Sequence, residues 1–559
     1  MNISVIKEIL IKKINFKRIT LAVLVAGVIC TSCSNEINDQ DKTGGKDGPI
    51  GYISLILSNS SVRGTETKAP DSLHYGTANE NKVNSVLIVL YNGDDPVNSE
   101  VKYQFILSDI GTPASPGSDI HSISSGTNTT TYRTKAKEVK KDNYKLAVFI
   151  NPPAILKSLT AEDCKLGFMT AAAKVTVDQL TMGENIRDNF LMGNFAGLVD
   201  VAENDIYATE AKAEAAPVEL DVERAVAKVT LSVADNLKAA SATFAANIGE
   251  IKWDVDVVNK KMYWMRNAAP MLDKTTISSG SATQTIPEKA IAANRIYMYA
   301  TDPNWDGVSH GRNSNLVTPL TDEFTYKYGT IDLPLIPSTS DEPVDAYVTE
   351  NTMVAPEQWE DVTTSVLISA VITPKTTCFG TTLPPGSQYF LFRNLAFTFL
   401  DIQQIHAAYS DPETVISSAG KTWKELKEEA ANSRIIVLPD ILEGMKGVDD
   451  FNGYAAVPGT SKDVVKPNGT VHFFAANAPN YYYVPIRHFR DELQSELMAY
   501  GRYGVVRNSW YNLVVTSIKN YGTAEIPKDR PDPDDKDKSW LSVEFTILPW
   551  VERGQGIEL

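Results

Sequence analysis

The chain has 559 residues, a hydrophobic fraction of 43% and a formal net charge of −16. A chain of this length usually divides into more than one core, so we expect two domains. The ordinary hydrophobic fraction excludes a disordered polymer and a multi-span membrane protein. The acidic balance argues against nucleic acid as a partner, because phosphate binding needs a concentrated basic face.

Residues 1–33 have the three parts of a secretory signal. A basic segment is followed by an apolar run at residues 21–29, which is shorter than the ~20 residues that span a bilayer. Small residues up to Ser32 then precede Cys33. This arrangement is similar to a lipobox, so we expect cleavage between Ser32 and Cys33 and a lipid on Cys33. Cys30 stands where an aliphatic residue is usual, and an ordinary secretory signal is the alternative.

The segment 34–63 is predicted to be a tether that ends in a removable strand. Its first part is polar and acidic and cannot bury a core. Ile53, Leu55 and Leu57 then occupy every second position, as a strand with one face in a core requires. Arg63-Gly64 follows in a polar, turn-rich stretch that suits an Arg-cleaving protease. A cut after Arg63 would release the strand from the body.

Strand patterns dominate the body of the chain. Apolar residues recur between turn residues in four clear runs, at 83–91, 144–150, 218–233 and 251–257. Many short strands separated by turns predict β-sandwiches, which we place at 64–240 and 241–525. Helices are predicted at 160–180, 422–432 and 485–500, the last because Ile486, Phe489, Leu493 and Leu497 are three and four residues apart.

The C-terminal segment 526–559 combines a linker with a further strand. Residues 526–538 are charged and proline-rich, without apolar periodicity, and are predicted to be solvated. Apolar positions then alternate again, at Leu541, Val543, Phe545 and Ile547, with Trp550 just beyond. A single terminal strand is not stable alone. It must dock on its own body or in a neighbouring subunit, by β-strand addition.

No motif in the chain indicates catalysis, a cofactor or a metal. The six histidines are scattered, and no H-E-x-x-H motif or phosphate-binding glycine loop is present. Cys30 and Cys33 have C-x-x-C spacing but lie in the signal segment, and the body that follows it has no such pair. Carboxylates are plentiful, but no particular pair stands out. We expect no catalytic residues, no cofactor and no metal site. Cys164 and Cys378 remain in the mature body, either as a disulfide or as two thiols.

Several segments together resemble the Bacteroidales type V fimbrillins, the family that includes the major subunit of the minor fimbriae of Porphyromonas. The most specific are residues 506–519 and 542–550, and further matches lie at 222–229, 347–352 and 372–375.

The resemblance implies two transthyretin-like β-sandwiches and no enzymatic activity. It also implies export as a lipoprotein to the outer membrane surface and removal of the N-terminal segment by an Arg-specific protease. The vacated groove would then accept the C-terminal strand of the next subunit, so that a fimbrial stalk grows. Partners would be identical subunits and accessory anchor or tip subunits.

Two alternatives remain open. The first is a monomeric surface lipoprotein that binds a glycan or another ligand, for which Tyr481, Tyr482, Tyr483 and Trp510 would supply an aromatic platform. The second is an anchor or tip component of a fimbria. A ligand-binding lipoprotein would need neither Arg63 nor a tethered C-terminal strand.

Overall fold

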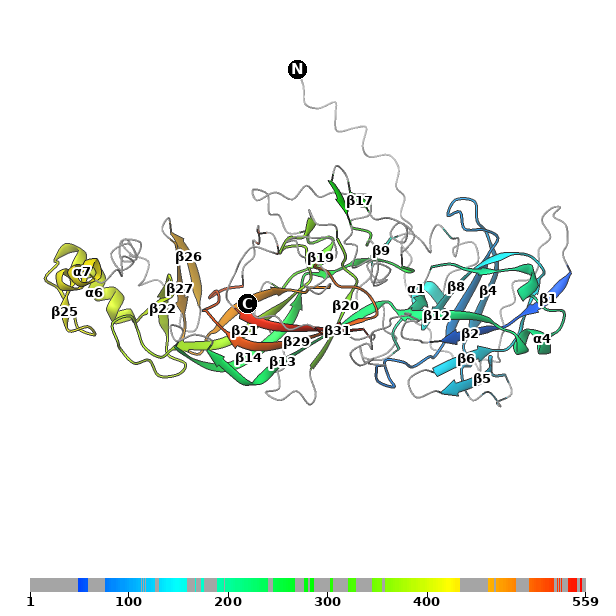
Figure 1. The fold of residues 1–559 in the computed structure, drawn as a ribbon, viewed down its shortest axis with the longest axis horizontal. Coiled ribbons are helices and arrows are strands. Elements are labelled where there is room, and N and C mark those ends of the chain that lie inside the picture. The colour runs from blue at the N-terminus through cyan, green and yellow to red at the C-terminus, as the bar shows by residue number, and fades with distance from the viewer. Residues whose placement is uncertain are drawn as a thin grey trace, which may run out of the picture. The chain divides into compact units, whose positions relative to one another are not determined.

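The computed structural model describes residues 49–58, 76–111, 113, 115, 117–125, 130–157, 166, 172–174, 189–195, 197–239, 245–266, 276–279, 282–285, 302–304, 320–327, 344–353, 357–432, 461–466, 469–488, 502–526, 530, 532, 534, 541–549 and 553–554. All of them belong to one unit of the chain, Gly45–Leu559. They form many strands and a few short helices, which confirms the predicted mostly-β class (Figure 1). The predicted lipid site at Ser32 and Cys33 lies outside the described residues, as do Arg63, Gly64, Cys164 and Trp550.

A nine-stranded sheet forms the N-terminal part of the described chain. Its spatial order is β4 (Val101–Leu107), β3 (Val86–Tyr91), β8 (Tyr144–Ile150), β10 (Met192–Asn194), β12 (Val218–Arg224), β2 (Leu55–Ser58), β6 (Thr130–Thr134) and β5 (Ile120–Ser125), and β11 (Val199–Val201) also pairs with β8. A separate two-stranded sheet pairs β1 (Ile50–Ile53) with β7 (Lys137–Lys140). Short helical turns are α1 (Ala154–Lys157), a 3-10 helix (Glu203–Asp205) and α4 (Glu210–Ala215).

Alternate residues of β3 face two different hydrophobic clusters. Val86, Ile88 and Leu90 belong to one cluster, together with residues of β2, β8 and β12. Their neighbours Leu87 and Val89 belong to a second cluster. A strand that is buried on both faces reads as a continuous apolar run, which is why residues 86–91 lack polar positions. We call the first cluster the N-terminal core.

A second large core lies between two further sheets. One has the order β20 (Val344–Thr349), β13 (Val226–Ala239), β29 (Ser509–Ile518), β30 (Leu541–Pro549) and β31 (Arg553–Gly554); the other has β14 (Ala246–Asp256), β21 (Ser365–Pro374) and β28 (Pro479–Pro485). Val229 on β13 and Trp253 on β14 are buried in the same cluster, which we call the C-terminal core. The predicted boundary at residue 240 lies between these two strands and stays a prediction.

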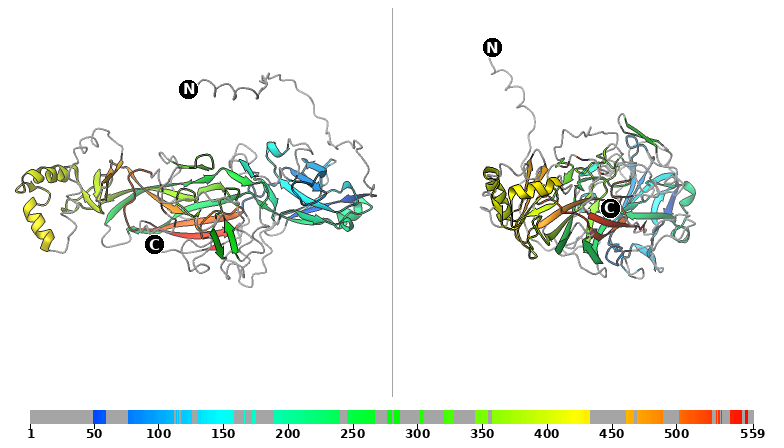
Figure 2. Two further views of the ribbon diagram at one scale, coloured as in Figure 1. Left: turned by 90° about the horizontal axis from the view of Figure 1, so that it is seen from above. Right: turned by 60° about the vertical axis from the view of Figure 1, so that its left-hand side comes forward.

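A further cluster joins a four-stranded sheet to two helices. The sheet order is β23 (Leu395–Phe397), β22 (Tyr389–Phe392), β27 (Gly469–Phe474) and β26 (Lys462–Lys466), and the helices are α6 (Phe399–Ser410) and α7 (Trp423–Asn432), drawn in yellow in Figures 1 and 2. Thr398 and Asp401 form a reciprocal capping box that starts α6. Ile402 and Ile405 on α6 are buried in the same cluster as Phe390 on β22.

The remaining strands are short pairs. They are β15 (Val258–Asn259) with β19 (Phe324–Thr325), β16 (Lys261–Tyr263) with β9 (Ala172–Lys174), β17 (Thr276–Ser279) with β18 (Ala282–Thr285), and β24 (Val415–Ile416) with β25 (Lys421–Thr422).

The helix predictions had mixed outcomes. The helix at 422–432 is confirmed as α7. The helix at 485–500 is wrong at its start, because Pro485 ends β28 and Arg487 forms a β-bridge with Tyr503; residues 489–500 lie outside the described part. Within 160–180, Leu166 is helical, as predicted, but residues 172–174 form a strand, so the helix prediction is wrong at that end. The spacing of apolar residues alone could not separate the end of a strand from a helix.

Candidate assembly site

The predicted removable strand lies inside the nine-stranded sheet. β2 pairs in parallel with β12, with Leu57 opposite Leu220, and antiparallel with β6, with Leu57 opposite Tyr132 (Figure 1). In the described part of the sheet, β2 is the strand that connects β12 to β6. Its removal would therefore leave a gap one strand wide, with the hydrogen-bonding groups of β12 and β6 exposed on either side.

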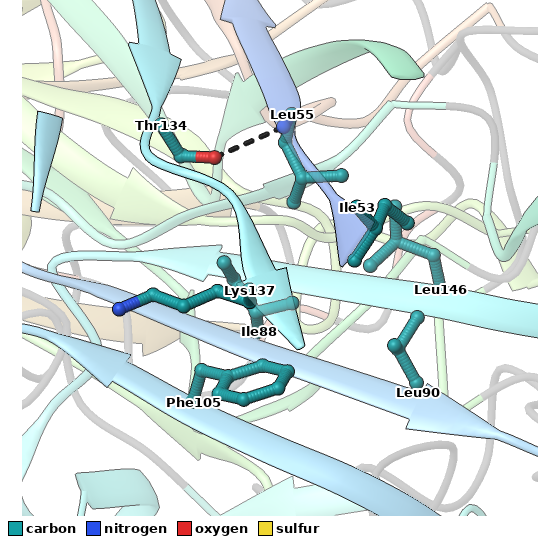
Figure 3. A pocket seen from close by; sticks show the side chains of 8 residues that line it. All are labelled: Ile53, Leu55, Ile88, Leu90, Phe105, Thr134, Lys137 and Leu146. Atoms are coloured by element: carbon teal, nitrogen blue, oxygen red, sulfur yellow. Dashed lines mark hydrogen bonds between the residues drawn. The ribbon is translucent and has the colours of Figure 1, made fainter. Parts of the chain in front are cut away.

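The side chains of this strand fill the N-terminal core. Ile53, Leu55 and Leu57 are 5%, 2% and 1% exposed and all belong to that core. Figure 3 shows Ile53 and Leu55 beside Leu146, with the Leu55 amide donating to Thr134 Oγ1 at 2.9 Å. The cavity between them measures about 10 Å³, which is roughly the room that one water needs. The groove is thus closely filled.

Backbone contacts extend this docking toward the N-terminal end of the segment. Tyr52 and Tyr207 exchange two main-chain hydrogen bonds, at 2.7 and 2.9 Å. A Cβ on Gly51 would lie 2.6 Å from Ile206 Cγ2, so only glycine permits this close approach without rearrangement. Residues 50–58 are therefore held as one nine-residue insert, interrupted at Ser54, whose hydroxyl donates to the Thr134 carbonyl at 2.7 Å.

The predicted donor strand is docked on its own chain. β30 pairs antiparallel with β29 along its whole length and carries β31 on its other side (Figures 1 and 2). The register places Val543, Phe545 and Ile547 opposite three core residues of β29, which are Val515, Leu513 and Tyr511, and places Leu541 opposite Ile518. β30 has nine residues, the same length as the insert at 50–58.

The prediction that the linker is solvated is wrong at the residues that the structure describes. Arg530 is 3% exposed and forms an ion pair with Asp256 at 2.5 Å. Asp534 is 7% exposed and accepts a hydrogen bond from Thr363 Oγ1 at 2.5 Å. Charged residues can be buried where each finds a partner, and Asp256 is 274 residues away in sequence, beyond any local pattern.

A buried polar cluster holds the first residues that are described after the predicted cleavage site. The carboxylate of Glu80 accepts hydrogen bonds from Lys228 Nζ at 3.0 Å and Tyr347 Oη at 2.7 Å. Burial raises the pKa of Glu80, but the Lys228 charge and the hydrogen bonds outweigh it, so the pKa lies below its usual value. Arg224, at the end of β12, donates to the Glu80 carbonyl at 3.1 Å and to Asn508 Oδ1 at 3.0 Å. Burial lowers the pKa of Arg224 to about 10.

Other kinds of site find no support among the described residues. No group of three or more metal-ligating side chains occurs among the described residues. None of the helices in the part of the chain that the structure covers has the length and hydrophobicity that crossing a membrane needs. Cys378 is a free, half-buried thiol, and burial with the nearby Asp401 raises the pKa of that thiol. Tyr482 of the proposed aromatic platform is buried in the C-terminal core, and Trp510 stacks on Lys228 at 4.6 Å.

Sequence reasoning missed the anchoring residues Arg530, Asp256, Glu80 and Lys228. Each belongs to a polar or mixed segment, and no local spacing joins the partners. It also missed α6, although the spacing of Thr398 and Asp401 is that of a capping box and would have been a usable signal.

Comparison with known proteins identifies the C-terminal region. Residues 474–556 match the family model described as "Major fimbrial subunit protein type IV, Fimbrillin, C-terminal". No curated protein matches the chain. The matched residues include β28, β29, the linker and β30, which are the elements that hold and carry the predicted donor strand.

Solved structures with some similarity come from bacteria of the genera Parabacteroides and Porphyromonas. They include a candidate cell adhesion protein from Parabacteroides distasonis (TM-score 0.40, 10% identity, covering 91% of this chain and 99% of that one). A fimbrilin from Porphyromonas gingivalis has a TM-score of 0.34 and 12% identity, covering 90% of this chain and 99% of that one. The tip fimbrial protein Mfa3 of the same organism, truncated at its C-terminus, has a TM-score of 0.32 and 10% identity, covering 89% of this chain and 100% of that one. The similarities are too small to assign a function. Residues 474–556 of this chain therefore match the C-terminal domain of the fimbrillins.

Proposed function

We propose that this chain is a structural stalk subunit of a cell-surface fimbria that polymerises by donor-strand exchange and supports adhesion. It is exported as a lipoprotein through Cys33 and reaches the outer membrane surface. An Arg-specific protease then cuts between Arg63 and Gly64. The chain acts as a structural protein and not as an enzyme. Its partners are identical subunits, with accessory anchor or tip subunits at the ends of the polymer.

The interior position of β2 is the observation that carries this proposal. Sheet edges are where strands are ordinarily gained or lost, whereas β2 lies between β12 and β6 and fills the N-terminal core. Burying Ile53, Leu55 and Leu57 stabilises the folded chain by about 5–9 kcal/mol in total, at about 1.5–3 kcal/mol each. A groove that has lost this segment would bind a replacement strand of alternating apolar residues strongly.

The C-terminal strand fits the role of that replacement. Its length equals that of the insert at 50–58, and its apolar residues Leu541, Val543, Phe545 and Ile547 alternate as Ile53, Leu55 and Leu57 do. In the uncleaved chain the groove is occupied, and β30 is stored on β29. After cleavage, each subunit offers both an open groove and a strand, which is what a growing stalk requires.

Limited proteolysis of the purified precursor tests this function. Trypsin should cut after Arg63, as N-terminal sequencing of the body would show, and ladders or filaments should follow on size analysis. The same protein lacking residues 540–559 should be cut and stay monomeric. A precursor that is cleanly cut at Arg63 and stays monomeric at high concentration would contradict the stalk function.

The ligand-binding lipoprotein is the second candidate, and the docking of β30 on its own chain favours it. For that protein the C-terminal strand is a permanent part of the sheet. Deleting 540–559 would then lower the stability of the uncleaved monomer without affecting any assembly. An anchor or tip component would form filaments only when mixed with a separate stalk subunit.

A further inference from the structure

The linker before β30 is fixed to the body by a buried ion pair. Arg530 Nη2 lies 2.5 Å from Asp256 Oδ2, and its guanidinium stacks over the Tyr483 ring at 4.2 Å. Asp256 is fully buried on β14 and also accepts hydrogen bonds from the amides of Val257 and Lys327, at 2.8 and 2.7 Å. The ion pair is therefore enclosed by protein and is not a surface contact.

A second group of contacts holds the linker four residues later. The Asp534 amide donates to the Gln358 carbonyl at 3.1 Å, and the Glu360 amide donates to the Asp532 carbonyl at 3.1 Å. Thr363 Oγ1 donates to the Asp534 carboxylate at 2.5 Å, and Tyr503 Oη donates to the Asp534 carbonyl at 3.3 Å. Main chain and side chain both bind the segment, so its position does not depend on one bond.

Undocking this segment would be far less favourable than detaching an ordinary linker. If Arg530 moved away, the Asp256 carboxylate would stay buried without its cation. Removing one partner of a buried ion pair is strongly unfavourable. The strand β30 is held by main-chain pairing with β29 and β31. Backbone pairing of this kind can be exchanged for the same pairing in a neighbouring subunit, whereas the buried ion pair cannot.

We propose that Arg530, Asp532 and Asp534 form a fixed anchor, so that only the chain after Asp534 moves when β30 is exchanged between subunits. This inference rests on the proposed donor-strand function and adds a geometric limit to it. Seven Cα steps separate Asp534 from Leu541, and an extended chain spans at most ~3.6 Å per residue. The groove of the receiving subunit must then begin within roughly 25 Å of the anchor.

Linker-length variants separate a fixed anchor from a linker that peels away. Deleting residues 535–537 shortens the moving part by roughly 10 Å and should slow filament growth at least tenfold. The matched variant adds Gly-Ser-Gly after Lys528 to the same deletion, which restores the total length upstream of the anchor. With the anchor in place this compensated variant should remain as slow as the deletion alone. Adding Asp256→Asn, Arg530→Gln and Thr363→Ala, which removes both the ion pair and the side-chain hydrogen bond to Asp534, should return it to within about threefold of the wild-type rate, since the inserted residues can then contribute to the reach.

Hydrogen exchange on the wild-type protein provides a test that depends on no variant. The amides of Glu360 and Asp534 should exchange equally slowly in the uncleaved monomer and in the filament. Loss of their protection in filaments would overturn the anchor, and so would wild-type growth of either the deletion or the compensated variant. Cleaved wild-type protein that forms no filaments would instead contradict the donor-strand function itself, so the two failures are distinguishable.

Discussion

Replacing Leu57 with alanine tests whether the first strand leaves the molecule on assembly. Leu57 is 1% exposed in the N-terminal core and lies opposite Leu220 of β12. Truncating a buried leucine costs about 2–5 kcal/mol, and we expect about 3 kcal/mol for Leu57→Ala in the uncleaved precursor. This free-energy loss corresponds to a roughly hundredfold larger equilibrium constant for unfolding. In filaments built from cleaved protein the effect should be close to zero, because residue 57 is no longer present.

Urea unfolding of both forms, followed by tryptophan fluorescence, measures the difference. Leu220→Ala is the matched control, since Leu220 is 4% exposed in the same core and stays in the subunit after cleavage. It should destabilise the precursor and the filament alike. If Leu57→Ala lowers the stability of filaments as much as that of the precursor, the strand is retained and the reasoning fails. A precursor that tolerates Leu57→Ala without loss would refute the packing argument.

Three further predictions follow from single residues. Arg63→Ala should prevent cleavage at this position by an Arg-specific protease and abolish filaments, whereas Arg63→Lys should restore both with trypsin; filaments from uncut Arg63→Ala would contradict the proposal. Cys33→Ser should eliminate incorporation of labelled palmitate in cells, and a labelled variant would show that the lipid is elsewhere. The lowered pKa of Glu80 means that its stabilising effect is complete above the unfolded pKa of 4.5 and is lost as the pH falls through the folded value, so Glu80→Gln should reduce the acid sensitivity of the precursor below pH 4.5 in thermal melts.

Local patterns in the sequence predicted the strands well. The runs at 144–150 and 251–257 are observed in β8 and β14, because alternation reflects contacts that each strand makes with a core on one or both of its faces. The same alternation predicted a strand at Ile53–Leu57, and its apolar side chains are buried in the N-terminal core. That β2 occupies the middle of a sheet could not be predicted, because its partners Val218 and Arg133 come from distant segments.

Polar anchors were the part that the sequence could not supply. Arg530 in a proline-rich stretch is indistinguishable from a solvated charge until Asp256 is placed beside it. The same holds for Glu80 and Lys228, which are 148 residues apart and both buried. A buried ion pair forms only when folding brings two distant segments together, whereas hydrophobic periodicity can be read within a single segment.

The interior position of β2 also bears on how such a chain avoids aggregation before assembly. Unpaired strand edges are templates for unwanted association. Without β2, the edges of β12 and β6 would both be open within one sheet. Because residues 50–58 precede the rest of the body in the chain, the segment that covers those edges is synthesised first and is present throughout folding. Under the proposed function, the insert would protect these edges until cleavage, and a protein expressed from residue 64 onward should form polymers or aggregates from the moment it folds.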